Sequence, residues 1–281
     1  MPRRWHGRAA LPARDHTNDN NDARQDLRVT REEAALGGWD WQVFCKNTVD
    51  GEVMPRCFGS GGDITYLQWM FSAWGWTLSV AALALLVALV VGSLVGIVRT
   101  TPSKGLVLFG NAWTELFRNI PLLVQIFLWY HVLPALIPPL KAFPSFILVV
   151  LALGFFTSAR ISEQVRAGIQ SLPRGQRYAG LALGLTLPQT YRHVLLPMAF
   201  RIVIPPLTSE SMNIVKNSSV AFAVSIAELT MFAMQAQEET SRGIEIYLAV
   251  TALYFVSAFV INRVAHVIEG RVRVPGMVGS K

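Results

Sequence analysis

The sequence predicts an all-α membrane protein with about five transmembrane helices, and three observations lead to this fold class. Charged residues make up only 15% of the 281 residues, against about 25% in a typical soluble domain. No Asp, Glu, Lys or Arg occurs in the segments 64–98, 119–140, 142–159 and 246–262. A helix needs about 20 apolar residues to cross about 30 Å of hydrocarbon, and these segments reach or approach that length. A soluble fold of this size would instead need several helices buried on all sides.

The predicted spans follow the charge-free segments. In chain order they are Trp74–Val98, Ile120–Leu140, Phe143–Ala159, a weaker span that starts near Ile202, and Ile246–His266. A short amphipathic stretch that ends in Glu115 and Arg118 precedes the second span. In the fourth, Pro205 and Pro206 are expected to break the helix, because proline lacks the backbone N–H that a helix interior requires.

The distribution of charge predicts which side of the membrane each loop occupies. Segment 160–201 carries six arginines against the single acid Glu163, whereas segment 228–245 carries four glutamates against Arg242. Short loops rich in Lys and Arg stay in the cytoplasm. We therefore expect the first segment inside, the second in the periplasm, the carboxyl terminus inside and the amino terminus outside. The net charge of +7 marks topology rather than a nucleic-acid surface.

The amino-terminal residues form two segments. Residues 1–37 are hydrophilic and poor in large apolar side chains, so they are expected to be disordered, unless translation begins further on, near Val29 or beyond. No apolar core follows the early arginines, so this is not a signal peptide. Residues 38–72 form an extracytoplasmic segment before the first span, and it holds the only cysteines, Cys45 and Cys57. These form a disulfide or remain two free thiols.

The loop between the third and fourth spans has an unusual composition. Pro173 and Gly175 break the preceding helix, and small residues then recur from Ala179 to Gly184. Thr186 is placed to cap a second short helix that runs to Leu196, before Pro197. Two short helices at a corner of small residues indicate a surface on which another protein docks. The plain alternative is an ordinary connecting loop.

Several motifs of this chain resemble those of a known protein family. Gly184, Val194 and Leu196-Pro197 have the spacing of the cytoplasmic signature of ABC importer permeases. Three stretches resemble the polar amino-acid branch of that family: ELFRNIPLLVQ (115–125), EQVRAGIQSLPRGQ (163–176) and KNSS (216–219). The runs LTLPQTYR (185–192) and RVRVPG (271–276) are most similar to glutamate/aspartate permeases. The resemblance covers about residues 38–281.

This resemblance implies the type I importer architecture, with a permease domain over 73–275 and a coupling helix in the cytoplasmic loop 173–201. It also implies several partners: two ATPase subunits below the membrane, a second and different permease chain, and a periplasmic amino-acid-binding protein. The family signature usually opens Glu-Ala-Ala, whereas this chain has Tyr178, Ala179 and Gly180. The missing glutamate puts a charged contact with the ATPase in doubt.

The fourth span is the expected substrate path. Ionisable groups at membrane depth are costly and mark pathways or partners, and Lys216 lies there beside Asn213, Asn217 and Ser218. Lys216 would attract a substrate carboxylate, or it would form a structural ion pair with Glu210 or Glu163. Glu163 and Arg166 are also candidates for the path. Because they stand three residues apart on a helix, they could instead pair with each other.

Other classes of membrane protein fit less well. The chain has no phosphate-binding loop of the Gly-x-x-x-x-Gly-Lys-Ser/Thr type, so energy must come from a partner, and the chain is expected not to be an enzyme. Its five histidines are scattered without metal-ligand spacing, so neither a metal nor another cofactor is expected. An ion-coupled secondary transporter would usually show inverted repeats and more spans. No motif of a channel selectivity filter is present.

Overall fold

The computed structural model describes residues 38–59 and 63–272, and the predicted disordered tail 1–37 lies outside them. Backbone contacts divide the chain after Trp41, and residues from Gln42 onward form one helical unit. Among the described residues, β structure is limited to two isolated bridges, Lys46 with Val53 and Asn47 with Thr65. The predicted all-α fold class is confirmed.

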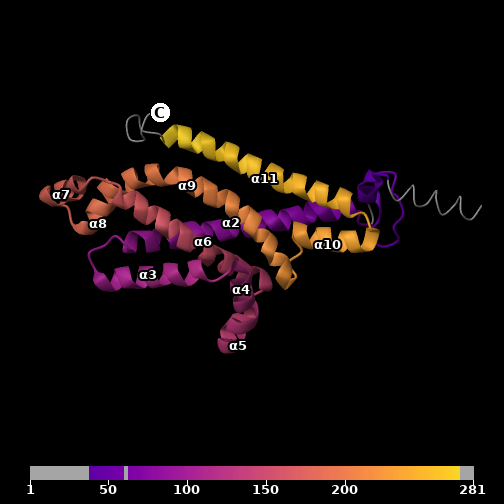
Figure 1. Ribbon diagram of the computed structural model, residues 1–281, viewed down its shortest axis with the longest axis horizontal. Helices are drawn as coiled ribbons and strands as arrows, with labels where there is room; N and C mark the ends of the chain where they lie inside the picture. Colours follow the sequence, from indigo (N-terminus) through magenta and orange to yellow (C-terminus); the bar gives the residue numbers. More distant parts are fainter. Residues whose placement is uncertain (1–37, 60–62, 273–281) are drawn as a thin grey trace, which may run out of the picture. The chain divides into compact units, whose positions relative to one another are not determined.

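The helical elements follow one another in the order shown in Figure 1. They are η1 (Trp41–Cys45), α2 (Tyr66–Val98), α3 (Lys104–Asn119), α4 (Leu122–Phe127), η2 (Leu128–Val132), α5 (Leu133–Leu136), η3 (Pro138–Ala142), α6 (Ser145–Gln170), α7 (Arg174–Ala182), α8 (Leu187–Thr190), η4 (Tyr191–Leu195), α9 (Leu196–Asn217), η5 (Ser218–Val224), α10 (Leu229–Thr240) and α11 (Gly243–Val272). Here η1, η3 and η5 are 3₁₀ helices, while η2 and η4 are π turns.

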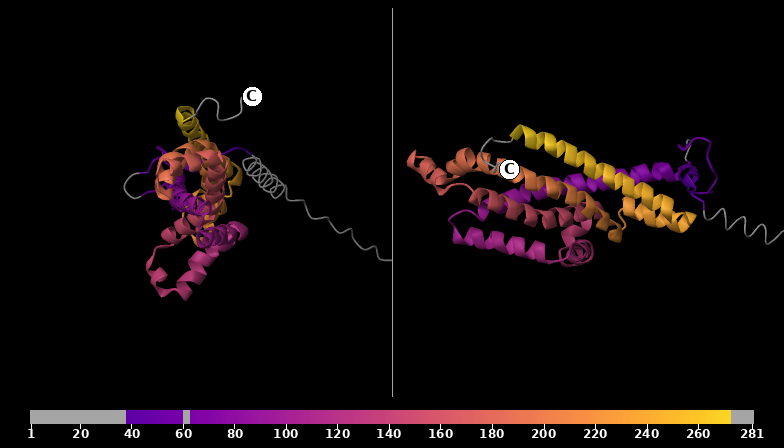
Figure 2. Two further views of the ribbon diagram at one scale, coloured as in Figure 1. Left: turned by 90° about the vertical axis from the view of Figure 1, so that its left-hand side faces the viewer. Right: turned by 45° about the horizontal axis from the view of Figure 1, so that its top comes forward.

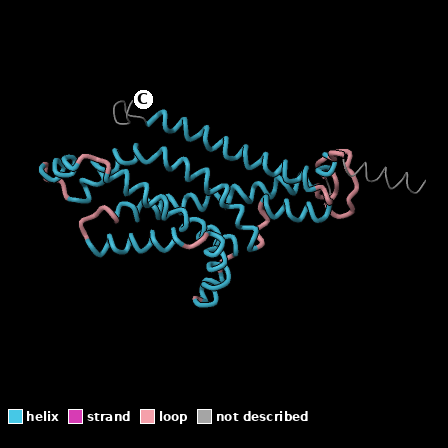
Figure 3. The backbone as a smooth tube through the Cα atoms, in the orientation of Figure 1, coloured by secondary structure: helices cyan, strands magenta, loops and turns pink. Residues whose placement is uncertain are grey.

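Three helices are long and apolar enough to cross a membrane alone: α2, α6 and α11. Two further spans are bent pairs, in which α3 meets Leu122–Leu136 at 105° and Leu187–Val224 meets α10 at 54°. The described chain therefore accommodates the predicted five spans, but two of them are not straight. Figure 3 shows the break after α3 and the break before α10 as loop between helical limbs.

Helices α2 and α6 pack closely because small residues occupy their contact. A Cβ added at Gly92 would lie 2.7 Å from the Ile161 side chain, and one at Gly96 would lie 2.7 Å from Val165. A Cβ added at Gly154 of α6 would likewise lie 2.7 Å from the Val87 side chain of α2. Helices in lipid associate through such close approaches, since burial of apolar surface there brings no gain over contact with lipid.

Several helix boundaries differ from the prediction. Helix α2 begins at Tyr66 rather than Trp74, because Thr65 and Gln68 form a capping box at its amino terminus. The predicted straight span Ile120–Leu140 is instead the short limb Leu122–Leu136 of a bent pair. Ile120 is extended, as expected of a residue that precedes proline, and α3 therefore ends at Asn119.

The prediction that prolines break the fourth span was wrong. Helix α9 runs through Pro205 and Pro206 to Asn217, and the break comes afterwards, in η5. Neighbouring helices keep such a helix intact although proline removes backbone hydrogen bonds. Pro197 does not end a helix either. The π turn η4 precedes it, with the Leu196 N–H donating to the Tyr191 carbonyl, and the wider turn accommodates a residue that has no N–H.

The loop α7–α8 and the segment before α2 lie at opposite ends of the helical unit (Figures 1 and 2). The structure joins Cys45 and Cys57 in a disulfide. The Thr65 hydroxyl donates to the Cys57 carbonyl at 2.7 Å, and the Tyr66 hydroxyl donates to Glu239 of α10 at 2.8 Å. These bonds tie the disulfide-closed segment to α2 and α10.

Candidate functional site

Helix α7 ends in a turn that only glycine adopts easily. Gly184 has φ +81°, a left-handed conformation that costs other residues about 1–2 kcal/mol. The Gly184 N–H donates to the Leu181 carbonyl at 3.0 Å and the Leu185 N–H donates to the Gly180 carbonyl at 3.1 Å. Together these two bonds form the Schellman motif, which satisfies the last carbonyls of a helix. Gly184 therefore sets the corner between α7 and α8.

Gly180 has a different role, which is close packing. A Cβ there would lie 2.8 Å from the Thr190 Cγ2 atom, so the last residue of α8 rests directly on α7. The predicted cap of α8 is present, because Thr186 and Gln189 form a capping box. The two short helices thus form one compact element.

The predicted coupling residues divide into two groups. Tyr178, Ala179 and Gly184 are exposed at the tip of the loop, with Tyr178 66% exposed, and the neighbouring Leu183 is 82% exposed. Val194, Leu196 and Pro197 instead lie at the base of the loop, in η4 and the start of α9. The exposed residues therefore form the tip of the loop, and the Leu196-Pro197 pair helps to form its base.

The base of the loop is bonded to the end of α2. The Tyr191 hydroxyl, in η4, donates to the Thr100 carbonyl at 2.7 Å, and its ring is buried. Arg99, just before Thr100, is buried. Its guanidinium donates to Asn111 of α3 at 2.9 Å, to Ser162 of α6 at 3.1 Å and to Glu163 of α6 at 2.8 Å. These hydrogen bonds connect the loop to the end of α2 and, through Arg99, to α3 and α6.

Arg99 was not predicted as a site residue, because its position after a charge-free segment was interpreted as the end of a span. The available signal was a basic residue beside a charge-free segment, which is equally typical of a residue at the membrane surface. Gln125 was missed as well. Its Nε2 donates to the carbonyls of Phe117 and Ile120 at 2.7 and 2.9 Å, so this buried amide caps α3 at the bend.

The expected substrate-path residues Asn213, Lys216 and Asn217 share one face of α9, because they stand three and four residues apart. Lys216 is exposed in the single chain, and the two asparagines are half-buried. Ser218 does not join this polar face. It is buried in η5, and its hydroxyl donates to the Val215 carbonyl near the end of α9 at 2.7 Å.

The carboxylates that could have paired with Lys216 have arginine partners. Glu163 accepts from Arg99 and lies 4.0 Å from Arg166, so the predicted i,i+3 pair is present. Glu210 is buried, 3.9 Å from Arg160. Within residues 38–59 and 63–272, Lys216 forms no ion pair with either glutamate.

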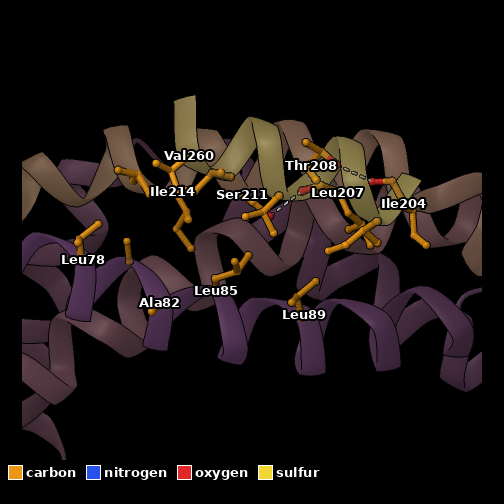
Figure 4. A pocket seen from close by; sticks show the side chains of 16 residues that line it. Leu78, Ala82, Leu85, Leu89, Ile204, Leu207, Thr208, Ser211, Ile214 and Val260 are labelled. Atoms are coloured by element: carbon orange, nitrogen blue, oxygen red, sulfur yellow. Dashed lines mark hydrogen bonds between the residues drawn. The ribbon is translucent and has the colours of Figure 1, made fainter. Parts of the chain in front are cut away.

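A cavity of about 520 Å³ lies between α2, α9 and α11 (Figure 4). Leu85 and Leu89 project into it from α2, and Leu207 does so from α9. Its hydroxyls are bonded within the protein, Ser211 to the Leu207 carbonyl at 2.9 Å and Thr208 to Glu269 at 3.0 Å. A cavity lined in this way offers no cation or free donor to an amino-acid carboxylate, so it is not a substrate site.

These features define a class of protein. A bundle of membrane helices carries a compact loop at one end and a polar face on α9, and its sequence has no nucleotide-binding loop, as in the membrane component of a transport system. Residues 88–274 match the family model described as the binding-protein-dependent transport system inner membrane component, and the chain belongs to this family. It is therefore a multi-pass inner-membrane transport subunit and not an enzyme.

Two curated relatives are similar over most of their length. The glutamate/aspartate import permease protein GltJ of Escherichia coli K12 is 41% identical over 253 residues, which cover 86% of this chain and 98% of GltJ. The probable glutamine ABC transporter permease protein GlnM of Bacillus subtilis 168 is 38% identical over 180 residues, which cover 64% of this chain and 82% of GlnM.

Solved structures share the fold. An amino acid ABC transporter crystallised with histidines has a chain that is 30% identical, with a TM-score of 0.65, and the match covers 73% of this chain and 95% of the other. The inward-facing MetNI methionine ABC transporter has the same TM-score at 20% identity, with 74% and 98% covered. The type I importer architecture predicted from the sequence is therefore confirmed.

Proposed function

We propose that this chain is the permease subunit of an ATP-driven importer for glutamate and aspartate. The observation that carries the proposal is its 41% identity with the glutamate/aspartate permease GltJ, across 98% of that protein. The polar face of α9 adds chemical support. Lys216 supplies a cation without a carboxylate partner among the described residues, and Asn213 and Asn217 supply amide groups to a polar substrate.

The ATPase subunits dock on loop 173–201, at the exposed tip formed by Tyr178, Ala179, Leu183 and Gly184. The tip has no acidic group, so its contact with the ATPase depends on packing of Tyr178 and Leu183. ATP binding moves the tip, and the bonds from Tyr191 to Thr100 and from Arg99 to Glu163 pass the movement to α2 and α6.

In this proposal the tip of α7 faces the cytoplasm. The disulfide-closed segment before α2, at the other end of the helical unit, then faces the periplasm (Figure 1). The disulfide supports this orientation, because disulfides persist in the periplasm. The amino terminus is then outside and the carboxyl terminus inside. A periplasmic amino-acid-binding protein delivers substrate at the disulfide end, and a second, different permease chain completes the pathway beside the polar face of α9.

Glutamine import is the second candidate, because GlnM is 38% identical over 82% of its length. Lys216 does not separate the two substrates, since both carry an α-carboxylate. Proteoliposomes that contain the complete transporter and its binding protein would test the proposal with labelled glutamate, aspartate and glutamine. ATP-dependent uptake of glutamate and aspartate, with glutamine failing to compete, is expected. Preferential glutamine uptake would establish the second candidate instead.

A further inference from the structure

A second cavity, of about 490 Å³, lies beneath the loop α7–α8. Thr100 at the end of α2, Gln170 at the end of α6 and Tyr191 of η4 contribute to its wall. The charge-free part of α2 ends at Val98, so Thr100 lies close to the level where hydrocarbon gives way to lipid headgroups. The volume is within the range of about 300–1,000 Å³ that is typical of ligand pockets.

The charge of this cavity is uncompensated. Arg174 and Arg177 of α7 line it, and none of its other lining residues is acidic. The sequence contains no Asp or Glu between positions 164 and 209, and the first turn of α7 carries none. Among the described residues neither arginine forms an ion pair with a carboxylate, and the buried Nε of Arg177 has no hydrogen-bond partner.

The remaining wall restricts what the cavity can hold. The hydroxyls of Thr100 and Tyr191 already donate, to the carbonyls of Ile97 and Thr100, so the remaining donors are the guanidinium groups and the side-chain amide of Gln170. Guanidinium groups match phosphate oxygens well. The buried side chains of Leu172 and Leu195 add apolar surface beside the cations. A ligand that fits both is anionic at one end and apolar at the other.

We propose that this cavity binds the phosphate of an acidic phospholipid headgroup, with the glycerol and the first carbons of the lipid against its apolar side. Basic pockets between the ends of membrane helices bind such headgroups in other proteins. The cavity wall includes Thr100, which follows α2, and residues of α6, α7 and η4, so the bound phosphate would link loop 173–201 to the segment after α2 and to the end of α6. This site does not depend on which amino acid is transported or on ATPase docking.

Binding of lipid to the full-length chain tests this proposal. The chain is purified in neutral detergent and titrated with short-chain phosphatidylglycerol or phosphatidylcholine, and bound lipid is counted by native mass spectrometry. Phosphatidylglycerol is expected to bind at one saturable site and phosphatidylcholine is not. Arg174→Gln combined with Arg177→Gln should weaken binding about 25-fold, since each arginine near anionic lipid contributes about fivefold in affinity.

Two matched variants make the result specific. Arg192→Gln with Arg201→Gln removes the same charge from exposed positions outside the cavity and should leave binding unchanged. Arg174→Lys with Arg177→Lys keeps the charge and should retain most of the binding, which separates a lost site from a misfolded chain. Equal losses of lipid binding in the Arg174→Gln/Arg177→Gln and Arg192→Gln/Arg201→Gln variants would show that positive charge alone attracts the lipid. The proposal would then be overturned.

Competition identifies the source of the phosphate. Inorganic phosphate and glycerol 3-phosphate are added at the concentration of lipid that saturates the site, and neither should displace phosphatidylglycerol. Displacement by inorganic phosphate at that concentration would identify a small-anion site and exclude the lipid. Absence of lipid binding in the isolated chain, combined with weaker ATPase association in the Arg174→Gln/Arg177→Gln variant, would assign the arginines to carboxylates of the ATPase and refute the lipid site.

Discussion

The hydroxyl of Tyr191 lies 2.7 Å from the carbonyl oxygen of Thr100 and donates a hydrogen bond to it. Tyr191 opens the π turn at the base of the coupling loop, and Thr100 follows the end of α2. Because a π turn has an extra residue, it is a place where a helix can change its hydrogen-bond register. This bond therefore joins the π turn before α9 to the segment that follows α2.

Replacing Tyr191 by Phe removes this bond while keeping the ring in its buried site. The free energy of unfolding should fall by about 1 kcal/mol, the usual net contribution of one hydrogen bond. Coupling should be affected more: transport per ATP hydrolysed should fall while ATPase docking persists. Uptake and ATPase rates in the same proteoliposomes measure this ratio. Tyr247→Phe, on the exposed side of α11, is the control. An unchanged ratio in Tyr191→Phe would exclude this path.

Removal of the buried guanidinium of Arg99 should be more damaging. Arg99→Gln removes the guanidinium that donates to Asn111, Ser162 and Glu163, and Glu163 keeps only the longer contacts to Arg118 and Arg166. Because Arg99 is 4% and Glu163 35% exposed, the cost should lie between the about 0–1 kcal/mol of an exposed pair and the about 3–5 kcal/mol of a buried one. Arg118→Gln serves as the comparison, because Arg118 is 60% exposed and lies 3.8 Å from the same carboxylate. Exposed pairs contribute about 0–1 kcal/mol. Thermal unfolding in detergent should show a lower Tm for Arg99→Gln than for Arg118→Gln. Equal Tm values would contradict the assigned role of Arg99.

Substitutions at Gly180 and Gly184 of loop 173–201 should respond differently to a second change at Thr190. Gly180→Ala places a Cβ 2.8 Å from Thr190 Cγ2, and Thr190→Ser removes that methyl group, so the double variant should regain ATPase docking. Gly184→Ala meets no atom within 4 Å but has φ +81°, so Thr190→Ser should not help it. Gly184→Asn should be milder, since asparagine tolerates this conformation. Pull-down of the ATPase measures both effects. Rescue of Gly184→Ala by Thr190→Ser would show that the turn is not the constraint.

Gln125 should hold the bend between α3 and α4. Gln125→Leu keeps the apolar volume but leaves the carbonyls of Phe117 and Ile120 without a donor, at a cost of about 1–3 kcal/mol for each buried group. Gln125→Glu retains the shape but cannot donate when ionised, so it should be at least as damaging. Hydrogen exchange of the backbone amides in 115–125 should rise in both variants. Unchanged exchange would mean that Pro121 alone sets the bend.

The sequence allowed prediction of the features that depend on composition and local chemistry. Charge-free segments indicated the spans, and Thr186 was identified as a helix cap. The coupling role of the segment from Gly184 to Pro197 stays a prediction. These signals come from neighbouring residues in the chain, so they need no knowledge of packing. The disulfide between Cys45 and Cys57 was one of two alternatives left open.

Features that depend on distant partners were not predictable. Pro205 and Pro206 were expected to break α9, yet packing in the bundle keeps the helix intact. Arg99 meets Glu163 only because α2 and α6 pack together through small residues, and the pairing has no sequence periodicity that would signal it. The role of Gly180 likewise required the position of Thr190 in space.

Lys216 provides the test of the substrate path. Lys216→Ala removes a cation from an exposed position on the polar face of α9, so assembly and ATPase docking should persist. The KM for glutamate should rise about tenfold, as expected for the loss of one charge-assisted hydrogen bond of about 1.5 kcal/mol, while Lys216→Arg should retain most of the affinity. Asn262→Ala, a polar-to-alanine change at a half-buried position on α11, serves as the control. Initial uptake rates at varied glutamate concentration measure KM, and normal uptake by Lys216→Ala at limiting glutamate would remove Lys216 from the path.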